Sequence, residues 1–147
     1  MLLIEAELRT SEIHGVGLFC VLPVPKGTKV WQFHPQFDVQ FDDSDMPALP
    51  PPIYAFLRKY AYRSRETKQF ILSIDLSRHM NHSDSPTLYS DADSSYYTAF
   101  DFAPGTELTC DYREFSTEGC SDFLDQQEAA AEWASATDRR QRLKSVV

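Results

Sequence analysis

Two glycines near the start of the chain could bring the backbone close to a ligand. Gly15 and Gly17 flank Val16, and glycine permits tight turns and close approach of other atoms to the main chain. Read alone, the pattern is also an ordinary turn that needs a positive φ angle. A dinucleotide-binding loop would require a helix after the pair and a third glycine, whereas residues 18–21 predict a strand. That class of cofactor is therefore not expected.

A second segment combines an amide, an imidazole and a hydroxyl in consecutive residues. Asn81, His82 and Ser83 supply hydrogen-bond donors and acceptors within one turn, which suits a zwitterionic ligand. The alternative is an Asx-type turn with a hydrogen-bonded core histidine. His79 and His82 are also candidate metal ligands, but the segment shows no metal-binding motif, so the sequence predicts no metal site.

A third segment, residues 105–112, ends in Cys110, Asp111 and Tyr112. The Pro-Gly turn at 104–105 separates two predicted strands, and these three residues come where the second strand ends. Taken alone, Tyr112 is simply an aromatic residue at a strand end.

Composition limits the classes of function. The 147 residues are 42% hydrophobic and 24% charged, which indicates one globular domain. The net charge of −8 argues against binding nucleic acid and suits a basic, lysine-bearing partner, although acidic surfaces also serve solubility alone. No apolar run approaches the ~20 residues of a membrane span. Glu5 and Glu7 follow an apolar start, which does not fit a signal peptide.

The three cysteines indicate a reducing environment. Cys20, Cys110 and Cys120 are odd in number, widely spaced and without a CxxC pair, so neither a disulfide framework nor a zinc site is predicted. We therefore expect a cytoplasmic protein.

Short strands dominate the elements that must position these segments. The strand candidates are residues 2–8, 18–21, 29–33, 37–41, 70–74, 96–102 and 107–109. A helix is expected after Pro50–Pro52, with Ile53, Phe56, Leu57 and Tyr60 on one apolar face. A second helix is expected from about Ser121. Strands without regular helical alternation predict a mainly β (β+α) domain with a helical insert at about 43–68 and a C-terminal helix.

Together the three segments resemble the SET-domain protein-lysine methyltransferases, and most closely the short single-domain bacterial type. The chain contains Gly15-Val16-Gly17, then Arg78-His79-Met80-Asn81-His82-Ser83, then Glu107-Leu108-Thr109-Cys110-Asp111-Tyr112, in the family's order over about residues 10–115. The resemblance implies a β-clip fold of small curved sheets with a C-terminal pseudoknot. It also implies a SET domain at 1–115 and a packed helical segment at 116–147.

The resemblance implies a role for each motif residue. The cofactor would be S-adenosylmethionine, converted to S-adenosylhomocysteine, and the methyl acceptor a lysine of a protein substrate. Tyr112 would be the catalytic tyrosine, with its hydroxyl near the transferred methyl group. The cofactor would be held by His14, Gly15, Val16, Gly17, Tyr60, Asn81 and His82, with Tyr62 as a neighbouring rival to Tyr60.

The chain also departs from the family pattern. Thr87 stands where an asparagine is usual, and the zinc-binding cysteine cluster that follows some SET domains is absent. The substrate channel, which includes Cys110, is therefore expected to be closed by Phe115, Phe123 or Trp133 from the C-terminal helix. Because Cys110 replaces a larger aromatic residue, we expect di- or trimethylation. A homodimer is expected to complete the peptide groove, and the alternative function is a non-catalytic SET-like protein-interaction module.

Overall fold

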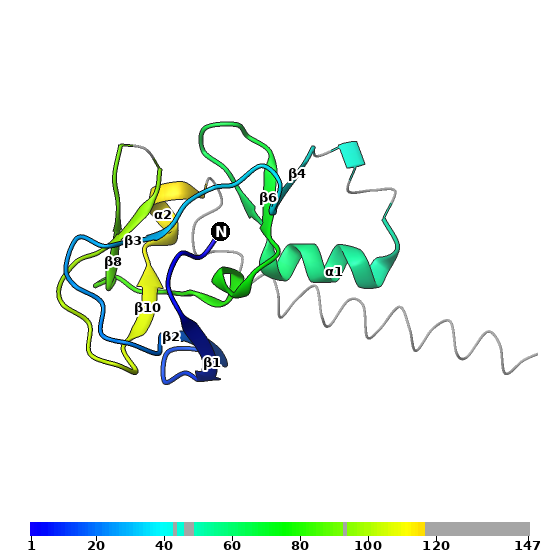
Figure 1. Cartoon of the computed structure of the whole chain (residues 1–147). Coiled ribbons are helices and arrows are strands. Elements are labelled where there is room, and N and C mark those ends of the chain that lie inside the picture. Colours follow the sequence, from blue (N-terminus) through cyan, green and yellow to red (C-terminus); the bar gives the residue numbers. More distant parts are fainter. Residues whose placement is uncertain (43, 46–48, 93, 117–147) are drawn as a thin grey trace, which may run out of the picture.

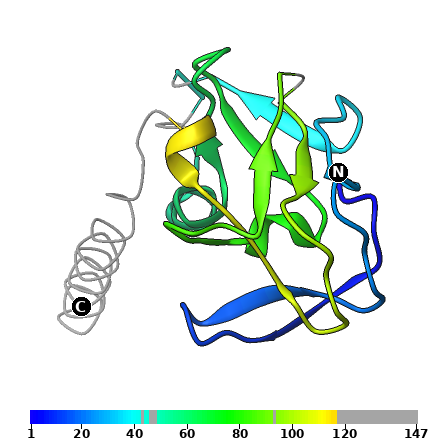
Figure 2. The same cartoon turned by 90° about the vertical axis from the view of Figure 1, so that its left-hand side faces the viewer.

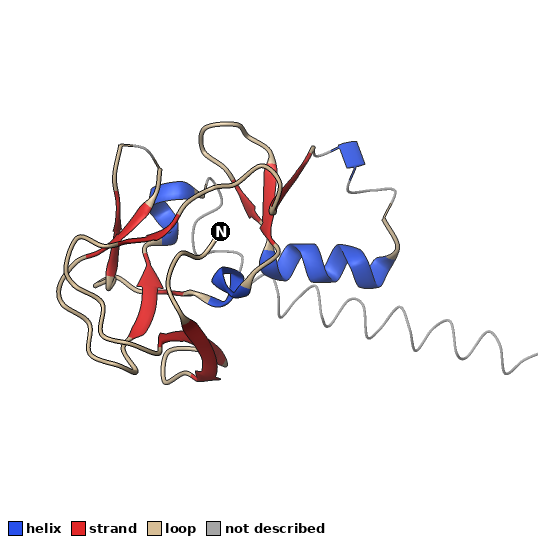
Figure 3. Ribbon diagram, viewed as in Figure 1, coloured by secondary structure: helices blue, strands red, loops and turns tan. Residues whose placement is uncertain are grey.

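The computed structural model describes residues 1–42, 44–45, 49–92 and 94–116 (Figure 1). Small sheets joined by loops make up most of this part of the chain, and the helices are short (Figure 3). The expected mainly β architecture is therefore confirmed. Among the described residues, no helix is long and apolar enough to cross a membrane.

A four-stranded sheet contains parts of all three chemical motifs. Its order is β1-β2-β10-β7, formed by β1 (Ala6–Thr10), β2 (Val16–Cys20), β10 (Glu107–Cys110) and β7 (Asn81–His82). β1 and β2 form an antiparallel hairpin, and β10 pairs antiparallel with β2 and parallel with β7. β10, which comes late in the sequence, thus lies between β2 and the Asn-His strand β7. It runs from the β1-β2 hairpin to α2 (Figure 2). This is the threaded arrangement that the family resemblance implies.

Two three-stranded sheets complete the β structure. One contains β3 (Lys29–Trp31), β9 (Tyr96–Thr98) and β8 (Leu88–Ser90), and the other contains β4 (Asp38–Phe41), β6 (Phe70–Ser73) and β5 (Tyr62–Arg63). All pairs within them are antiparallel. Several expected strands are shorter or shifted: the first begins at Ala6, and the strand expected at 96–102 ends at Thr98 because Phe102 pairs separately with Val24.

The helix expected after the prolines is α1 (Pro51–Tyr60), which begins with proline at its first positions, where no backbone donor is needed. It lies beside β6, at the opposite end of the molecule from β8 (Figure 1). Its predicted apolar face is only partly used: Leu57 packs against Phe70, but Ile53 and Phe56 are 48% and 43% exposed. The helix and the spacing of these residues are as predicted, but only Leu57 of the face is buried in the small second core.

Two shorter helices flank the Asn-His strand. The 3-10 helix η2 (Leu76–His79) precedes β7, and α2 (Tyr112–Phe115) follows β10 directly. Asp75 and Asp111 cap them, since each side chain accepts a hydrogen bond from a backbone N–H two residues later. Phe115 thus belongs to a helix of its own, before the helix expected from about Ser121. That expected helix, with Phe123 and Trp133, lies outside the described residues.

The main core lies between the four-stranded sheet and the β3-β9-β8 sheet. Leu18, Leu88 and Leu108 are completely buried there and come from β2, β8 and β10. Because each strand contributes one face to this core, the sheets are held in fixed relative positions. The core therefore fixes β10, and with it the start of α2.

Candidate active site

The parallel pairing of β7 with β10 brings the second and third motifs together. Asn81 lies opposite Thr109, and His82 lies opposite Cys110. Tyr112 follows immediately, and its hydroxyl donates a 2.6 Å hydrogen bond to the carbonyl oxygen of Met80. The Tyr112 backbone N–H donates to His82 Nδ1 at 3.2 Å. The tyrosine is therefore held at two points by the segment that contains Asn81.

A cavity of about 530 Å³ opens beside Tyr112. The Phe115 ring packs against three other rings that line the cavity. Its centroid lies 4.6 Å from the ring centroid of Tyr62, 5.6 Å from that of Tyr112 and 6.0 Å from that of Tyr96. These four rings meet edge to face, the arrangement that aromatic pairs favour. Cys110, which is 5% exposed, also lines the cavity. Four aromatic rings and a thiol thus form a narrow, mostly apolar wall.

Two phenols of this wall, those of Tyr62 and Tyr96, remain neutral near pH 7 because their pKa values are raised. Burial raises the pKa of Tyr62 well above its usual value, and nearby Asp38 and Cys110 add to the shift. Burial likewise raises the pKa of Tyr96, with smaller contributions from Cys110 and Glu114. Neutral phenols can donate and accept hydrogen bonds but cannot act as bases near neutral pH. The wall is therefore suited to an apolar side chain with a polar end.

Another part of the cavity lining is basic and surrounds Tyr60. The guanidinium carbon of Arg78 lies 5.8 Å from the centre of the Tyr60 ring, and Lys59 Nζ lies 5.2 Å from it. His79 packs edge-on against the same ring, and burial and these two cations lower the pKa of its imidazole. Cations over an aromatic face favour an anionic ligand nearby. Tyr60 and Tyr62 are the two candidates for the cofactor-contacting tyrosine, and both line the cavity.

Arg78 offers a donor to such a ligand. Its Nη1 donates to the carbonyl oxygens of Ile74 and Asp75, both at 2.8 Å, which fixes the guanidinium. Its Nε is buried and has no partner among the described residues. Buried donors normally have a partner, so this nitrogen is suited to a ligand carboxylate. Sequence analysis assigned Arg78 no role beyond its place in the motif.

The glycine turn is joined to Asn81 but does not line the cavity. Asn81 is 5% exposed, and its Nδ2 donates to the carbonyl oxygen of His14 at 3.2 Å and, at a longer 3.4 Å, to that of Val16. Gly15 has a φ of +47°, which only glycine adopts readily. His14, Gly15 and Val16 are exposed. The structure thus assembles the predicted turn and Asn81 into one unit next to the cavity residues Tyr60 and Tyr112.

Thr87, which stands where the family usually has an asparagine, hydrogen-bonds to β10. Its hydroxyl donates to the Glu107 carbonyl oxygen at 2.8 Å and accepts from the Thr109 N–H at 2.8 Å. Its own N–H donates to Thr109 Oγ1 at 3.0 Å. Thr87 therefore fastens the loop after the Asn-His strand to β10, and its side chain serves the fold.

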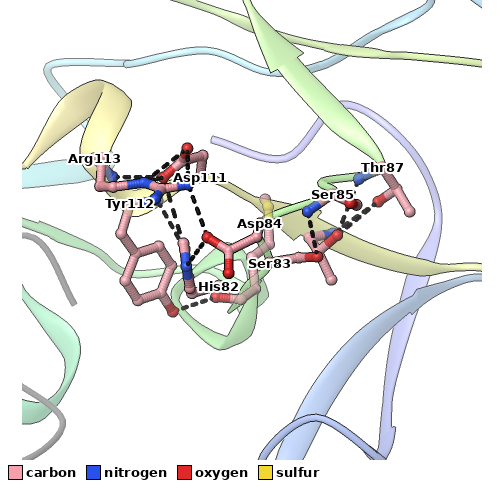
Figure 4. A network of polar contacts seen from close by, with 10 residues as sticks. His82, Ser83, Asp84, Ser85, Thr87, Asp111, Tyr112 and Arg113 are labelled. Carbon is pink, nitrogen blue, oxygen red and sulfur yellow. Dashed lines mark hydrogen bonds and ion pairs between the residues drawn. The ribbon is translucent and has the colours of Figure 1, made fainter.

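A polar network covers the outer side of His82 (Figure 4). His82 Nε2 lies 3.6 Å from Asp84, and Arg113 bridges Asp84 and Asp111 with 2.8 Å contacts to each. Hydrogen bonding from Arg113 lowers the pKa of Asp111. The network ties the loop after β7 to α2 and so to Tyr112. Within the described residues, histidine, cysteine and acidic side chains form no group of three suited to a metal ion.

Trp31 and Tyr96 are cavity residues that the sequence did not single out. They lie opposite each other on β3 and β9, with ring centroids 6.0 Å apart, and both are 6% exposed. Trp31 Nε1 and the Tyr96 hydroxyl are buried without a partner among the described residues. Sequence reasoning assigned both to ordinary strands, because the unpaired atoms become visible only when the sheets pack around the cavity.

Comparison with known proteins identifies the class. A family model described as SET domain matches residues 15–113, which is more than half of the chain, so the chain belongs to the SET-domain family. Membership supports a methyltransferase-type function. A solved structure from Plasmodium falciparum, named as a "putative histone methyltransferase", is similar at 14% identity with a TM-score of 0.49, covering 74% of this chain and 92% of that one. In the comparison with curated proteins, no relative matches at a significant level.

Proposed function

We propose that this protein is an S-adenosylmethionine-dependent protein-lysine N-methyltransferase. The observation that carries the proposal is the hydrogen bond from the Tyr112 hydroxyl to the Met80 carbonyl at the wall of the aromatic cavity. It places a phenol oxygen and a carbonyl oxygen beside Asn81, where the family resemblance implies methyl transfer.

The residues present fit the cofactor. A cavity of about 530 Å³ has the size of a small-molecule site. The unpartnered Arg78 Nε suits the carboxylate of the cofactor, and Tyr60 offers an aromatic face beside it. His14, Gly15, Val16, Gly17, Asn81 and His82 would contribute from the turn and the Asn-His strand. S-adenosylmethionine supplies an electrophilic methyl group on a sulfonium, so the protein needs no covalent nucleophile of its own.

The aromatic wall would prepare the lysine amine. With a pKa of ~10.4, free lysine is mostly charged at pH 7, and its neutral form costs roughly 4–5 kcal/mol. Burial among Tyr62, Tyr96 and Phe115 removes water and lowers this cost by disfavouring the charged form. The oxygens of Tyr112 and Met80 would then orient the reacting groups through hydrogen bonds and weak C–H···O contacts.

The substrate is proposed to be a basic, lysine-bearing protein. The chain carries 22 acidic against 14 basic side chains, so its overall field attracts such partners. Because Cys110 is small and lines the cavity, it leaves room for an amine that already carries methyl groups. We therefore expect di- or trimethyllysine as the product, and a strictly monomethylated product would contradict this part.

The test is transfer of an isotopically labelled methyl group. The full chain is incubated with labelled S-adenosylmethionine and a mixture of lysine-rich basic proteins, and methyllysine is identified by mass spectrometry. Tyr89→Phe provides the matched control for Tyr112→Phe, because Tyr89 lies on β8 and is not among the cavity residues. Label in methyllysine that disappears only with Tyr112→Phe supports the proposal. Label on other atoms, or none, contradicts it.

A further inference from the structure

The carboxylate of Glu107 connects two segments that lie far apart in the sequence. Glu107 begins β10, and its Oε1 accepts a hydrogen bond from Asn81 Nδ2 at 2.9 Å. The Ser11 hydroxyl lies 2.8 Å from the same oxygen and 3.0 Å from Oε2. One carboxylate therefore receives donors from β7 and from the hairpin between β1 and β2.

Ser11 carries this connection into the glycine turn. Its hydroxyl oxygen accepts from the Ile13 N–H at 2.9 Å, and its own N–H donates to the Gly15 carbonyl oxygen at 3.0 Å. Asn81 completes the circuit, because its amide also donates to the His14 carbonyl oxygen. Displacing Glu107 would thus loosen both the turn and Asn81. The turn and Asn81 are also joined directly, through the bond from Asn81 to His14.

Gly17 provides the space that Glu107 occupies. A Cβ atom at Gly17 would lie 2.2 Å from Glu107 Oε1 and 2.8 Å from its Cδ. Such contacts are impossible without moving the carboxylate. Gly17 is itself buried, and its backbone does not adopt a positive φ. The side chain of Glu107, in the third motif, therefore explains why a glycine stands at position 17.

We propose that Glu107 is a positioning residue for the cofactor site: its carboxylate sets the geometry of both Asn81 and the 11–17 turn without touching the cofactor. This inference rests on the proposed function, since it concerns the cofactor held by these elements. It separates Glu107 from Tyr112, which lies on the other side of β10 from the turn and is assigned to the transfer step.

The main test is Glu107→Ala, with direct titration of S-adenosylhomocysteine. Loss of hydrogen bonds to two elements is expected to weaken binding about tenfold. Glu107→Gln should stay within about threefold, because its remaining carbonyl oxygen can still accept from both Asn81 and Ser11. Glu7→Ala is the matched control: Glu7 lies on neighbouring β1, pairs with Arg9 at the surface and is 48% exposed at its side chain. It should leave the affinity unchanged.

A second readout needs no cofactor. Asn81 is the only asparagine in the chain, so one side-chain amide pair in the nuclear magnetic resonance spectrum reports its hydrogen bonds. In Glu107→Ala this pair should shift, and the Ile13 amide should exchange with solvent faster. In Glu7→Ala neither should change.

Gly17→Ala gives an independent route that does not alter Glu107. Alone it should weaken cofactor binding about as much as Glu107→Ala, because it expels the carboxylate. Added to Glu107→Ala it should cost less than it does alone, because only the 3.0 Å contact between the new Cβ and Ser11 Cβ then remains. Fully additive effects would overturn the inference, as would unchanged affinity and unchanged Asn81 signals in Glu107→Ala. If the wild-type protein binds no cofactor, the proposed function fails, and the Asn81 and Ile13 signals still show whether Glu107 positions them.

Discussion

At the start of β10, the polar groups around Glu107 are paired within the chain. Beyond the end of β10, the cavity around Tyr112 contains buried polar atoms that have no partner in the described part of the chain. The Asn81 amide, the Ser11 hydroxyl and the Glu107 carboxylate bond one another. Trp31 Nε1 and the Tyr96 hydroxyl, in contrast, are unpartnered among the described residues. The first region is a preformed scaffold, and the second is suited to receive polar groups from a ligand or from water.

The difference separates two tasks on a single strand. The scaffold around Glu107, together with the Arg78 and Tyr60 side of the cavity, would determine how tightly cofactor binds, while the aromatic wall around Tyr112 would determine how fast the methyl group moves. A residue of either region should therefore change mainly one of two measured quantities, cofactor affinity or turnover.

The largest effect is expected at Tyr112. Tyr112→Phe removes the hydroxyl that bonds Met80, and turnover should fall at least tenfold, or at least ~1.4 kcal/mol, while cofactor affinity stays nearly constant. Single-turnover kinetics and calorimetry measure the two quantities separately. Equal losses of affinity and turnover would remove the distinction between the regions, and unchanged turnover would remove Tyr112 from the site.

A second effect appears at high pH. The folded pKa values of Tyr62 and Tyr96 are raised above the unfolded value, so their contribution to stability is complete below about pH 10 and is lost as pH rises above it. Unfolding by urea should therefore become easier above about pH 10. In Tyr62→Phe/Tyr96→Phe this pH dependence should be weaker, and the phenolate absorbance that develops last in the wild type should be missing. An identical titration of both proteins would show that the wall is open to water.

The smallest effect is expected in the outer network. Asp84 is 80% exposed at its side chain, so its 2.8 Å pair with Arg113 is strongly screened. Asp84→Asn should lower the free energy of unfolding by less than about 1 kcal/mol, with a smaller difference at high salt. Urea denaturation at two salt concentrations measures this. A loss of several kcal/mol would show that the network holds α2 in place.

The sequence predicted the parts that depend on neighbouring residues. The turn at Gly15 and the proline-initiated helix are local, and their residue types determine them directly. The motif resemblance placed Asn81 and Tyr112 in one site, and β7, which contains Asn81, does pair with β10, the strand that precedes Tyr112. Where any of the predicted site residues, Asn81 and Tyr112 included, touches a ligand stays a prediction.

Other features depend on contacts between distant residues and could not be read from local patterns. The bond between Asn81 and Glu107 forms only because β10 inserts between β2 and β7. The exposed side of α1 is a second example. The periodicity of Ile53 and Phe56 fits an apolar face, but whether a core covers that face depends on the whole fold.

Calorimetric titration of the full chain with S-adenosylmethionine and S-adenosylhomocysteine, beside Asn81→Ala, tests the central claim most directly. It needs no knowledge of the protein substrate. We expect micromolar binding of both ligands by the wild-type protein and its loss in Asn81→Ala, because the amide of Asn81 holds the turn in place. Absence of binding by the wild-type protein would contradict the account and favour a SET-like interaction module.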